Sequence, residues 1–407
     1  MTPSAATSLS FGEVLRISAV KRLFFAQIVS VFGDFLALFA VIAHVTFNLH
    51  GTPTQIAMIM VSFLLPLAFF SPVAGVFVDK WNVKATMVTS DVVRGLLILS
   101  LVFVHSLNAI YVIFFVLAMV SAFFMPAQSV AVRTIAPAAG LLAVNALMSQ
   151  AFQGSQIIAP SLSGTLVQLV GANACYLFDT ASFFFSAGML MTIPIHRDIA
   201  PHTEAASVFR SMRTGYHFMF THATISFVVI SMATGMFAVR GFGALLSVYV
   251  RDLLGSTSAA FGVLNTLIGV GMIVGTQSIT RFGKHIPKQN LVVYGLSLMG
   301  LAVLLTAAFT TMPTTAAGML VMGFGAAFIM ITSQTLLQQE TPKEMLGRVS
   351  SSLMSLMAFS QVIAMFLAGP VAERIGIRNL YFGSAAMLLG IGLLGRARIR
   401  ARVPAAG

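Results

Sequence analysis

The chain has almost no cysteine. Cys175 is the single cysteine among 407 residues, so an internal disulfide and a cluster of metal-binding thiolates are both excluded. The eight histidines do not show the spacing of metal ligands. We therefore expect no metal site and no cofactor.

Charge is also scarce. Only 8% of the residues are charged, whereas 58% are hydrophobic and the mean hydropathy is +0.95. A soluble domain of this length would expose too much apolar surface to water, so the composition predicts a membrane protein. The net charge is +12, but the basic residues are scattered and form no basic stripe interleaved with aromatics. Nucleic acid is therefore not an expected partner.

Motifs for hydrolysis and for ATP-driven work are missing. Gly283-Lys284 is followed by His285, so it does not complete a phosphate-binding loop. The chain contains no His-Glu-x-x-His and no Gly-x-Ser-x-Gly, and its intramembrane charges are dispersed along the sequence. We therefore expect neither an enzyme nor an ATP-driven pump.

Long apolar runs dominate what is present. A helix needs about 20 apolar residues to cross the hydrocarbon core of a bilayer. The runs are continuous and do not alternate, which favours helices over barrel strands. Twelve spans are predicted: Lys21–Asn48, Gln55–Val78, Ala85–Val104, Ala109–Ala136, Leu141–Leu169, Ala172–Pro194, Ala223–Val250, Ser256–Arg281, Asn290–Phe309, Thr314–Glu340, Glu344–Ala372 and Ile377–Leu394.

The positions of Lys and Arg predict the orientation. Most of the 23 basic residues fall on the side of the predicted spans that also holds both termini. Basic loops face the cytoplasm, where they lie beside anionic lipid headgroups. The first residues are polar and lack the apolar core of a signal peptide. We expect a multi-pass protein of the cytoplasmic (inner) membrane with both termini in the cytoplasm.

A hydrophilic stretch divides the spans into two sets of six. We predict a cytoplasmic N-terminal segment at 1–20, an N-terminal six-helix bundle at 21–195, a cytoplasmic linker at 196–222, a C-terminal six-helix bundle at 223–395 and a basic cytoplasmic tail at 396–407. Similar residues recur at an offset of about 200 residues, as in parallel-repeat transporters with a site between the halves. The recurring sets are Gly75 with Gly275, Gln128 with Gln334, and Pro160, Gly171 and Tyr176 with Pro370, Gly376 and Tyr381.

Two segments have the character of motifs. The loop Gly75-Val-Phe-Val-Asp79-Lys80-Trp-Asn-Val-Lys84 joins the second and third spans. Asp91 and Arg94, at i, i+3 in the third span, are expected to pair and to brace this loop. In the fifth span, small residues permit close helix contact and a proline permits a kink. This second motif consists of Ser155, Ala159, Pro160, Ser163 and Gly164.

Both segments resemble signatures of the major facilitator superfamily, namely its cytoplasmic loop and its antiporter motif. The resemblance implies a gating role for the loop residues Gly75, Asp79, Lys80, Lys84, Asp91 and Arg94, and export for the second motif. Ser30-Val-Phe-Gly33-Asp34, Phe124-Met-Pro126-Ala127 and Pro342-Lys-Glu344-Met-Leu-Gly347-Arg348 are similar to the exporter branch that includes the enterobactin exporter and macrolide efflux proteins. The resemblance extends over nearly the whole chain. It implies an all-α membrane protein with twelve transmembrane helices in two pseudo-symmetric six-helix halves, the major facilitator fold. It also implies a cavity lined by the first, fourth, seventh and tenth helices.

The chain departs from the resembled pattern in two places. Asn82 and Val83 replace a glycine and an arginine of the loop signature. The proton-coupled drug antiporters of the family carry an arginine inside the fourth helix, whereas Arg133 comes only at the end of that span here. The expected coupling role therefore falls on Asp34.

Polar side chains inside the spans are the candidate site. Asp34 lies about 20 Å into the first span at 1.5 Å per residue, and Gln27 lies on nearly the same face. Such a carboxyl group is a candidate for proton coupling. Arg240 either extends toward the interface or attracts an anionic substrate. Asp179, away from the cavity helices, is expected to be structural. The cavity candidates are Gln27, Asp34, Gln128, Arg240, Gln334 and Gln338.

The predicted function is secondary active transport. We expect a proton-coupled exporter of an amphipathic small molecule, drug-like or siderophore-like, working by alternating access. Its partners are the substrate, protons and the lipid bilayer, and a monomer is expected. A lysophospholipid or other lipid carrier and an uncoupled facilitator are the alternatives within transport. A non-transporting membrane receptor or scaffold is the alternative from another class.

Overall fold

The computed structural model describes residues 9–78, 80–104, 106–195, 205–283, 286–342 and 345–402, which are almost entirely helical and contain no β-strand. These residues group into two compact units. The first unit comprises Met1–His44 and Ser62–Thr203, and the second comprises Val45–Val61 and Glu204–Gly407. Helix α3 (Pro53–Val78) thus begins in the second unit and ends in the first.

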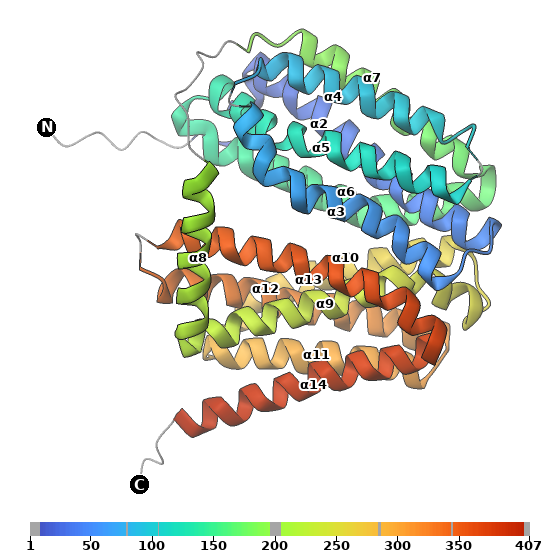
Figure 1. The fold of residues 1–407 in the computed structure, drawn as a ribbon, viewed down its shortest axis with the longest axis vertical. Helices are drawn as coiled ribbons and strands as arrows, with labels where there is room; N and C mark the ends of the chain where they lie inside the picture. Colours follow the sequence, from blue (N-terminus) through green and yellow to red (C-terminus); the bar gives the residue numbers. More distant parts are fainter. Residues whose placement is uncertain are drawn as a thin grey trace, which may run out of the picture. The chain divides into compact units, whose positions relative to one another are not determined.

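The first unit contains the helices drawn from blue to green in Figure 1. In chain order they are α1 (Phe11–Arg16), α2 (Ser18–Ala43), most of α3, α4 (Val83–Ser100), α5 (Leu107–Ile135), η2 (Ala138–Gly140), α6 (Leu141–Val170) and α7 (Ala172–Met191). Helix α2 packs against α6 and α7, and α4 packs against α5 and α7. Helix α2 is therefore a central element of this unit.

The second unit repeats this arrangement. It contains η1 (His44–Asn48) from Val45 onward, α8 (Ala205–Thr221), α9 (Ala223–Asp252), α10 (Ser258–Phe282), α11 (Lys288–Ala308), α12 (Met312–Glu340), α13 (Leu346–Ile375) and α14 (Ile377–Arg402). Helix α9 packs against α13 and α14 as α2 packs against α6 and α7, and α11 packs against α12 and α14 as α4 packs against α5 and α7. The same order of contacts in both units supports the predicted duplication.

The repeat extends to backbone geometry. Helices α6 and α13 each contain a proline, Pro160 and Pro370, and end at a glycine. Gly171 has φ 88° and Gly376 has φ 85°, a conformation that glycine adopts without steric cost. Tyr176 and Tyr381, five residues beyond each glycine, are both buried. The sequence recurrence therefore marks two equivalent helix ends.

Ten helices in the described part of the chain are long and apolar enough to cross a membrane. Helices α4 and α6 occupy the other two predicted spans and are more polar. Helix α4 carries Lys84, Asp91 and Arg94 within 18 residues, and α6 is rich in serine and glutamine. The buried polar residues of these two helices are Ser90, Asp91 and Arg94 on α4 and Ser155 and Ser163 on α6.

Besides the short helix η2, three helical segments of the described chain lie outside the predicted spans. Within the predicted linker, α8 forms a helix that packs against α13 and α9 and crosses the end of their bundle in Figure 1. Helix α14 continues through the predicted basic tail to Arg402, because its alternating Arg, Ala and Ile residues retain helical propensity. Near the N-terminus, α1 begins with a capping box in which Ser10 donates to Glu13. These hydrogen bonds lower the pKa of the exposed Glu13 carboxyl.

Candidate functional site

Polar side chains line one face of helix α2. Gln27, Ser30 and Asp34 are spaced three and four residues apart, which places them on one face of the helix. Gln27 and Ser30 are buried, and Asp34 is half-buried. The amide nitrogen Nε2 of Gln27 has no hydrogen-bond partner among the described residues. This face is therefore an interior polar stripe in an otherwise apolar helix.

Arg94 on α4 contacts both Asp34 in the stripe of α2 and Asp91 on α4. Its guanidinium pairs with the carboxylate of Asp91 one turn away, and its Nη1 lies 3.6 Å from Oδ2 of Asp34. The Asp91 side chain is fully buried, whereas that of Asp34 retains 29% exposure. The Phe124 and Phe183 rings lie 4.4 and 4.5 Å from the guanidinium carbon, which adds cation–π stabilisation. Arg94 is thus fixed by four side chains from four helices.

Asp179 on α7 adds a third carboxyl group. It is fully buried, and it lies against Gly33 of α2, the residue before Asp34. Ser182 donates a hydrogen bond to its Oδ1 at 3.0 Å, while Oδ2 has no hydrogen-bond partner in the described structure. Gly33 makes room for this carboxyl group, because a Cβ at position 33 would overlap Asp179 Oδ1 and lie 2.5 Å from Ser182 Oγ.

The described residues therefore place three carboxyl groups between α2, α4 and α7, and the Arg94 guanidinium lies within ion-pair distance of two of them. We call Asp34, Asp91, Arg94 and Asp179 the carboxyl cluster. Like charges repel strongly where the dielectric constant is low, so full ionisation of the cluster is unfavourable. Its chemistry suits binding and release of a proton. We find no set of His, Cys, Asp and Glu side chains in the described structure that could hold a metal ion.

The cluster contains one predicted pair and one contact that was not predicted. The Asp91–Arg94 pair is confirmed, but Arg94 also reaches Asp34, a contact that was not predicted. Asp179 was expected to be structural, and that role stays a prediction, while its carboxyl group lies against Gly33 next to Asp34. The signal for Asp179 was available in the sequence, because Asp179, Ser182 and Ser186 form a polar stripe with the same spacing as Gln27, Ser30 and Asp34.

The other cavity candidates are divided between the units. In the first unit, Gln128 on α5 is half-buried, with its Nε2 3.9 Å from Sδ of Met148. In the second unit, Gln334 and Gln338 on α12 are exposed, and Arg240 on α9 donates from Nε to Oε1 of Gln361 on α13 at 2.8 Å. Convergence of the two sets on a shared cavity stays a prediction.

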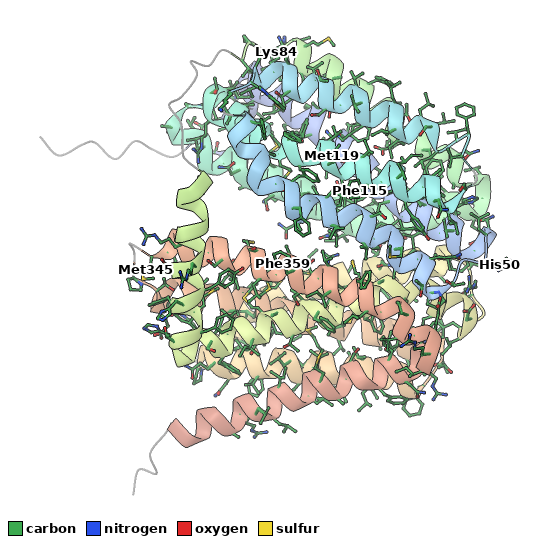
Figure 2. The ribbon with its side chains drawn as sticks, in the orientation of Figure 1. His50, Lys84, Phe115, Met119, Met345 and Phe359 are labelled. Atoms are coloured by element: carbon green, nitrogen blue, oxygen red, sulfur yellow. The ribbon has the colours of Figure 1, made fainter. Side chains whose placement is uncertain are left out.

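The predicted gating loop is described only in part. Gly75 lies near the end of α3, Lys80 is exposed and Lys84 is half-buried near the start of α4, where Figure 2 labels it. Asp79 lies outside the described residues. Asn82, which departs from the resembled signature, caps α4 by accepting a hydrogen bond from Ala85 N at 2.9 Å. A gating role for this loop stays a prediction.

The small residues of α6 pack against α2. Ser155, Ala159, Pro160, Ser163 and Gly164 are all buried, and α6 is a main neighbour of α2. The Ser163 hydroxyl donates to the carbonyl of Leu36 at 2.9 Å. Close helix packing by this motif is therefore present, while its proposed link to export stays a prediction.

The second unit has a separate polar cluster around the segment that follows α2. Arg251 at the end of α9 donates to the carbonyl oxygens of Thr46 at 2.8 Å and Gly51 at 2.9 Å. The buried hydroxyl of Thr46 donates to that of Ser247 at 2.9 Å. The carboxylate of Glu373 on α13 accepts from Thr54 N at 3.1 Å. These bonds hold residues 46–54 to α9 and α13.

The chain is similar to known membrane transporters along most of its length. The family described as Major Facilitator Superfamily matches residues 23–357. An uncharacterized MFS-type transporter of Bacillus subtilis, YfiS, is 25% identical, with 91% of this chain and 90% of that protein covered. Macrolide efflux protein A of Streptococcus pyogenes is 22% identical, with coverage of 90% and 93%. The multi-drug resistance efflux pump PmrA of Streptococcus pneumoniae is 22% identical, with coverage of 78% and 79%.

Solved structures agree on the fold. The nucleoside transporter NupG superposes with a TM-score of 0.75 at 12% identity, covering 94% of this chain and 99% of that one. The POT family transporter PepTSo gives a TM-score of 0.71 at 12% identity, with coverage of 95% and 98%. The family match covers most of the chain, and the helices have the fold of these transporters. The chain belongs to the Major Facilitator Superfamily, a family of membrane transporters.

Proposed function

We propose that the protein is a proton-coupled exporter of an amphipathic small molecule that works by alternating access. Its relatives include a macrolide efflux protein and a multi-drug efflux pump, which favours export over uptake. We place it in the cytoplasmic membrane with both termini in the cytoplasm, acting as a monomer and without enzymatic activity. The distribution of Lys and Arg supports this orientation.

The carboxyl cluster is the observation that carries the coupling proposal. Three ionised carboxylates beside one guanidinium would leave two negative charges unpaired between α2, α4 and α7. Removing unpaired charges from water costs several kcal/mol per ion, so we infer that at least one of the carboxyl groups holds a proton. Asp34 is the one of the three whose side chain retains exposure, so it exchanges that proton with water.

Coupling follows from the contact between Asp34 and Arg94. Protonation of Asp34 removes its negative charge and weakens the 3.6 Å ion pair that joins α2 to α4. Deprotonation restores the pair. A change of proton occupancy thereby changes the attraction between two helices, and a transporter needs such a link to drive a conformational change with a proton gradient.

The test is transport in proteoliposomes with and without an imposed pH gradient, with a siderophore, a macrolide and a lysophospholipid as substrates. Flux that saturates with substrate and accelerates with the gradient supports proton-coupled transport. Saturable flux that ignores the gradient indicates a facilitator, and flux of the lysophospholipid alone indicates a lipid carrier. Absence of flux for every substrate, with intact substrate binding, indicates a receptor or scaffold.

A further inference from the structure

Arg240 is an isolated cation in the middle of a membrane-spanning helix. It lies 12 residues before the end of α9, about 18 Å from that end at 1.5 Å per residue, which is too far for its side chain to reach the interface. In the described part of the second unit no carboxylate lies within ion-pair distance of it. Arg94 in the first unit, by contrast, pairs with Asp91 and Asp34.

The only hydrogen bond from Arg240 to the described residues goes to a neutral group. Its Nε donates to Oε1 of Gln361, and the Gln361 amide nitrogen donates to the carbonyl of Met357 at 3.2 Å. The amide is thereby oriented with its oxygen toward Arg240. A guanidinium has five N–H donors in a planar fork, and the remaining donors of Arg240 make no hydrogen bond to the described protein. This half-buried side chain is therefore prepared to bind an anion.

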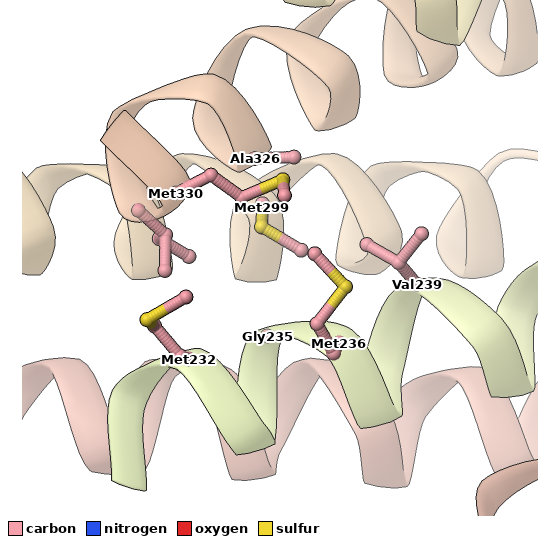
Figure 3. A pocket seen from close by; sticks show the side chains of 8 residues that line it. Met232, Gly235, Met236, Val239, Met299, Ala326 and Met330 are labelled. Atoms are coloured by element: carbon pink, nitrogen blue, oxygen red, sulfur yellow. The ribbon is translucent and has the colours of Figure 1, made fainter. Parts of the chain in front are cut away.

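The stretch of α9 just before Arg240 lines an apolar pocket together with α11 and α12. Met236 precedes Arg240 by four residues, so the two side chains are neighbours along the helix surface, about 5–6 Å apart between Cβ atoms. Figure 3 shows the methionine side chains of α9, α11 and α12 turned toward one another. The side chains that line the pocket include Met232, Met236, Val239, Met299, Ile329 and Met330.

The pocket has room for about one water molecule, so a ligand enters it only when side chains move. Methionine has an unbranched, flexible side chain and adapts to ligands of varied shape. Met236 and Met330 are half-buried and Met299 is buried, so Met236 and Met330 have the most freedom to move when a ligand enters.

We propose that Arg240 and this pocket bind an anionic amphiphile, with its carboxylate or phosphate group on the guanidinium and its apolar part against the methionines. This rests on the proposed transport function and adds the substrate's charge. An arginine fork binds carboxylate and phosphate through paired, charge-assisted hydrogen bonds. Within a membrane such a ligand also supplies the counter-ion that the described protein does not provide at Arg240.

Binding to the protein in nanodiscs of zwitterionic lipid tests this directly. The probes are a fluorescent twelve-carbon carboxylic acid, its methyl ester, and the matching alkyl phosphate. We expect the acid and the phosphate to bind about tenfold or more tightly than the ester, as charge-assisted hydrogen bonds predict. A preference for the phosphate alone would indicate a phospholipid-like ligand, and an equal preference would indicate anions in general. Equal binding of the acid, the phosphate and the ester would overturn the inference.

Two variants and a control make the test specific. Arg240→Gln should remove the preference for the anions and leave ester binding unchanged. Gln361→Glu places a carboxylate beside the guanidinium, so it should also abolish anion preference while raising thermal stability. If Arg240 had only a structural role, Gln361→Glu would not remove the preference for anions while it raises thermal stability. Arg378→Gln, which removes donors to the carbonyls of Ala307 and Ala308, is the control and should bind all three probes as the wild type does.

The binding assay separates this inference from the proposed transport function. Gradient-driven transport without anion preference, or with preference retained in Arg240→Gln, would contradict the anion site and leave proton-coupled transport standing. Anion preference that depends on Arg240, without any flux, would contradict the transport proposal and leave the binding site standing.

Discussion

Arg94 on α4 lies 3.6 Å from the carboxylate of Asp34 on α2 while forming a tighter pair with Asp91 on its own helix. The contact with Asp34 joins α2 to α4, whereas the pair with Asp91 lies within α4. A proton that neutralises Asp34 therefore changes the contact between helices and leaves Arg94 paired with Asp91. This asymmetry is the structural basis of the proposed coupling.

Removing Arg94 should unfold much of the protein. Arg94→Gln leaves the fully buried Asp91 without its counter-ion, which costs about 3–5 kcal/mol for a buried pair. We expect a large fall in the thermal midpoint measured by dye-based unfolding in detergent. Adding Asp91→Asn to Arg94→Gln removes the unpaired charge and should recover most of the midpoint. No recovery would mean that packing of the Arg94 side chain, between Phe124 and Phe183, accounts for the loss.

Gly33 should not tolerate alanine. The added Cβ would overlap the carboxyl group of Asp179, so Gly33→Ala should destabilise the first unit by about 1–3 kcal/mol, the usual cost of overpacking. Gly154→Ala on α6 is the matched control, because a Cβ at position 154 would have no neighbouring atom within 4 Å. It should leave the thermal midpoint unchanged or raise it. Equal midpoints for the two variants would show that α2 and α7 are not in the close contact described.

Arg251 should hold residues 46–54 in place. Arg251→Gln removes the donors to the carbonyls of Thr46 and Gly51, so amide exchange in this segment should become faster, by about tenfold for each 1.4 kcal/mol lost. Hydrogen exchange with mass spectrometry measures this. Arg378→Gln removes similar donors at another site and should leave the segment protected. Unchanged exchange in Arg251→Gln would show that Ser247 and Glu373 are sufficient to hold it.

The predicted gating loop can be tested by changing its two central residues. Gly75→Leu places a bulky side chain near the end of α3, and Asp79→Ala removes the only acid of the loop. If the loop controls switching, each change should alter the balance between inward-facing and outward-facing states. Electron–electron distance measurements between labels on the cytoplasmic ends of the two halves report those populations. Unchanged distance distributions in both variants would count against a gating role.

The helices were predictable because each apolar run must satisfy its own backbone in a membrane. The predicted spans correspond to α2 through α7 and α9 through α14. Helix α1, helix α8 and the end of α14 were not predicted. Helix α8 lies in the hydrophilic linker, where its stability depends on packing against α13 and α9. Helix α14 continues to Arg402, beyond the apolar run that defined its predicted end.

The candidate site was predictable only where its residues are neighbours along one helix. Asp91 and Arg94 are one turn apart, so helical periodicity identified their pair. The contacts of Arg94 with Asp34 and of Asp179 with the same cluster join different helices, and their register depends on packing that a single sequence does not specify. Gly33 carried a clue, since a glycine beside an intramembrane aspartate allows a neighbouring helix to approach closely.

The most direct test of proton coupling compares wild type with Asp34→Asn in proteoliposomes that contain a trapped pH indicator. Adding a transported substrate to the wild type should produce a proton flux, and an imposed pH gradient should accelerate substrate flux. Asp34→Asn, with a folded state confirmed by its thermal midpoint, should lose both responses because its amide cannot exchange a proton. An Asp34→Asn variant that keeps substrate-dependent proton flux and gradient-driven transport would contradict the account.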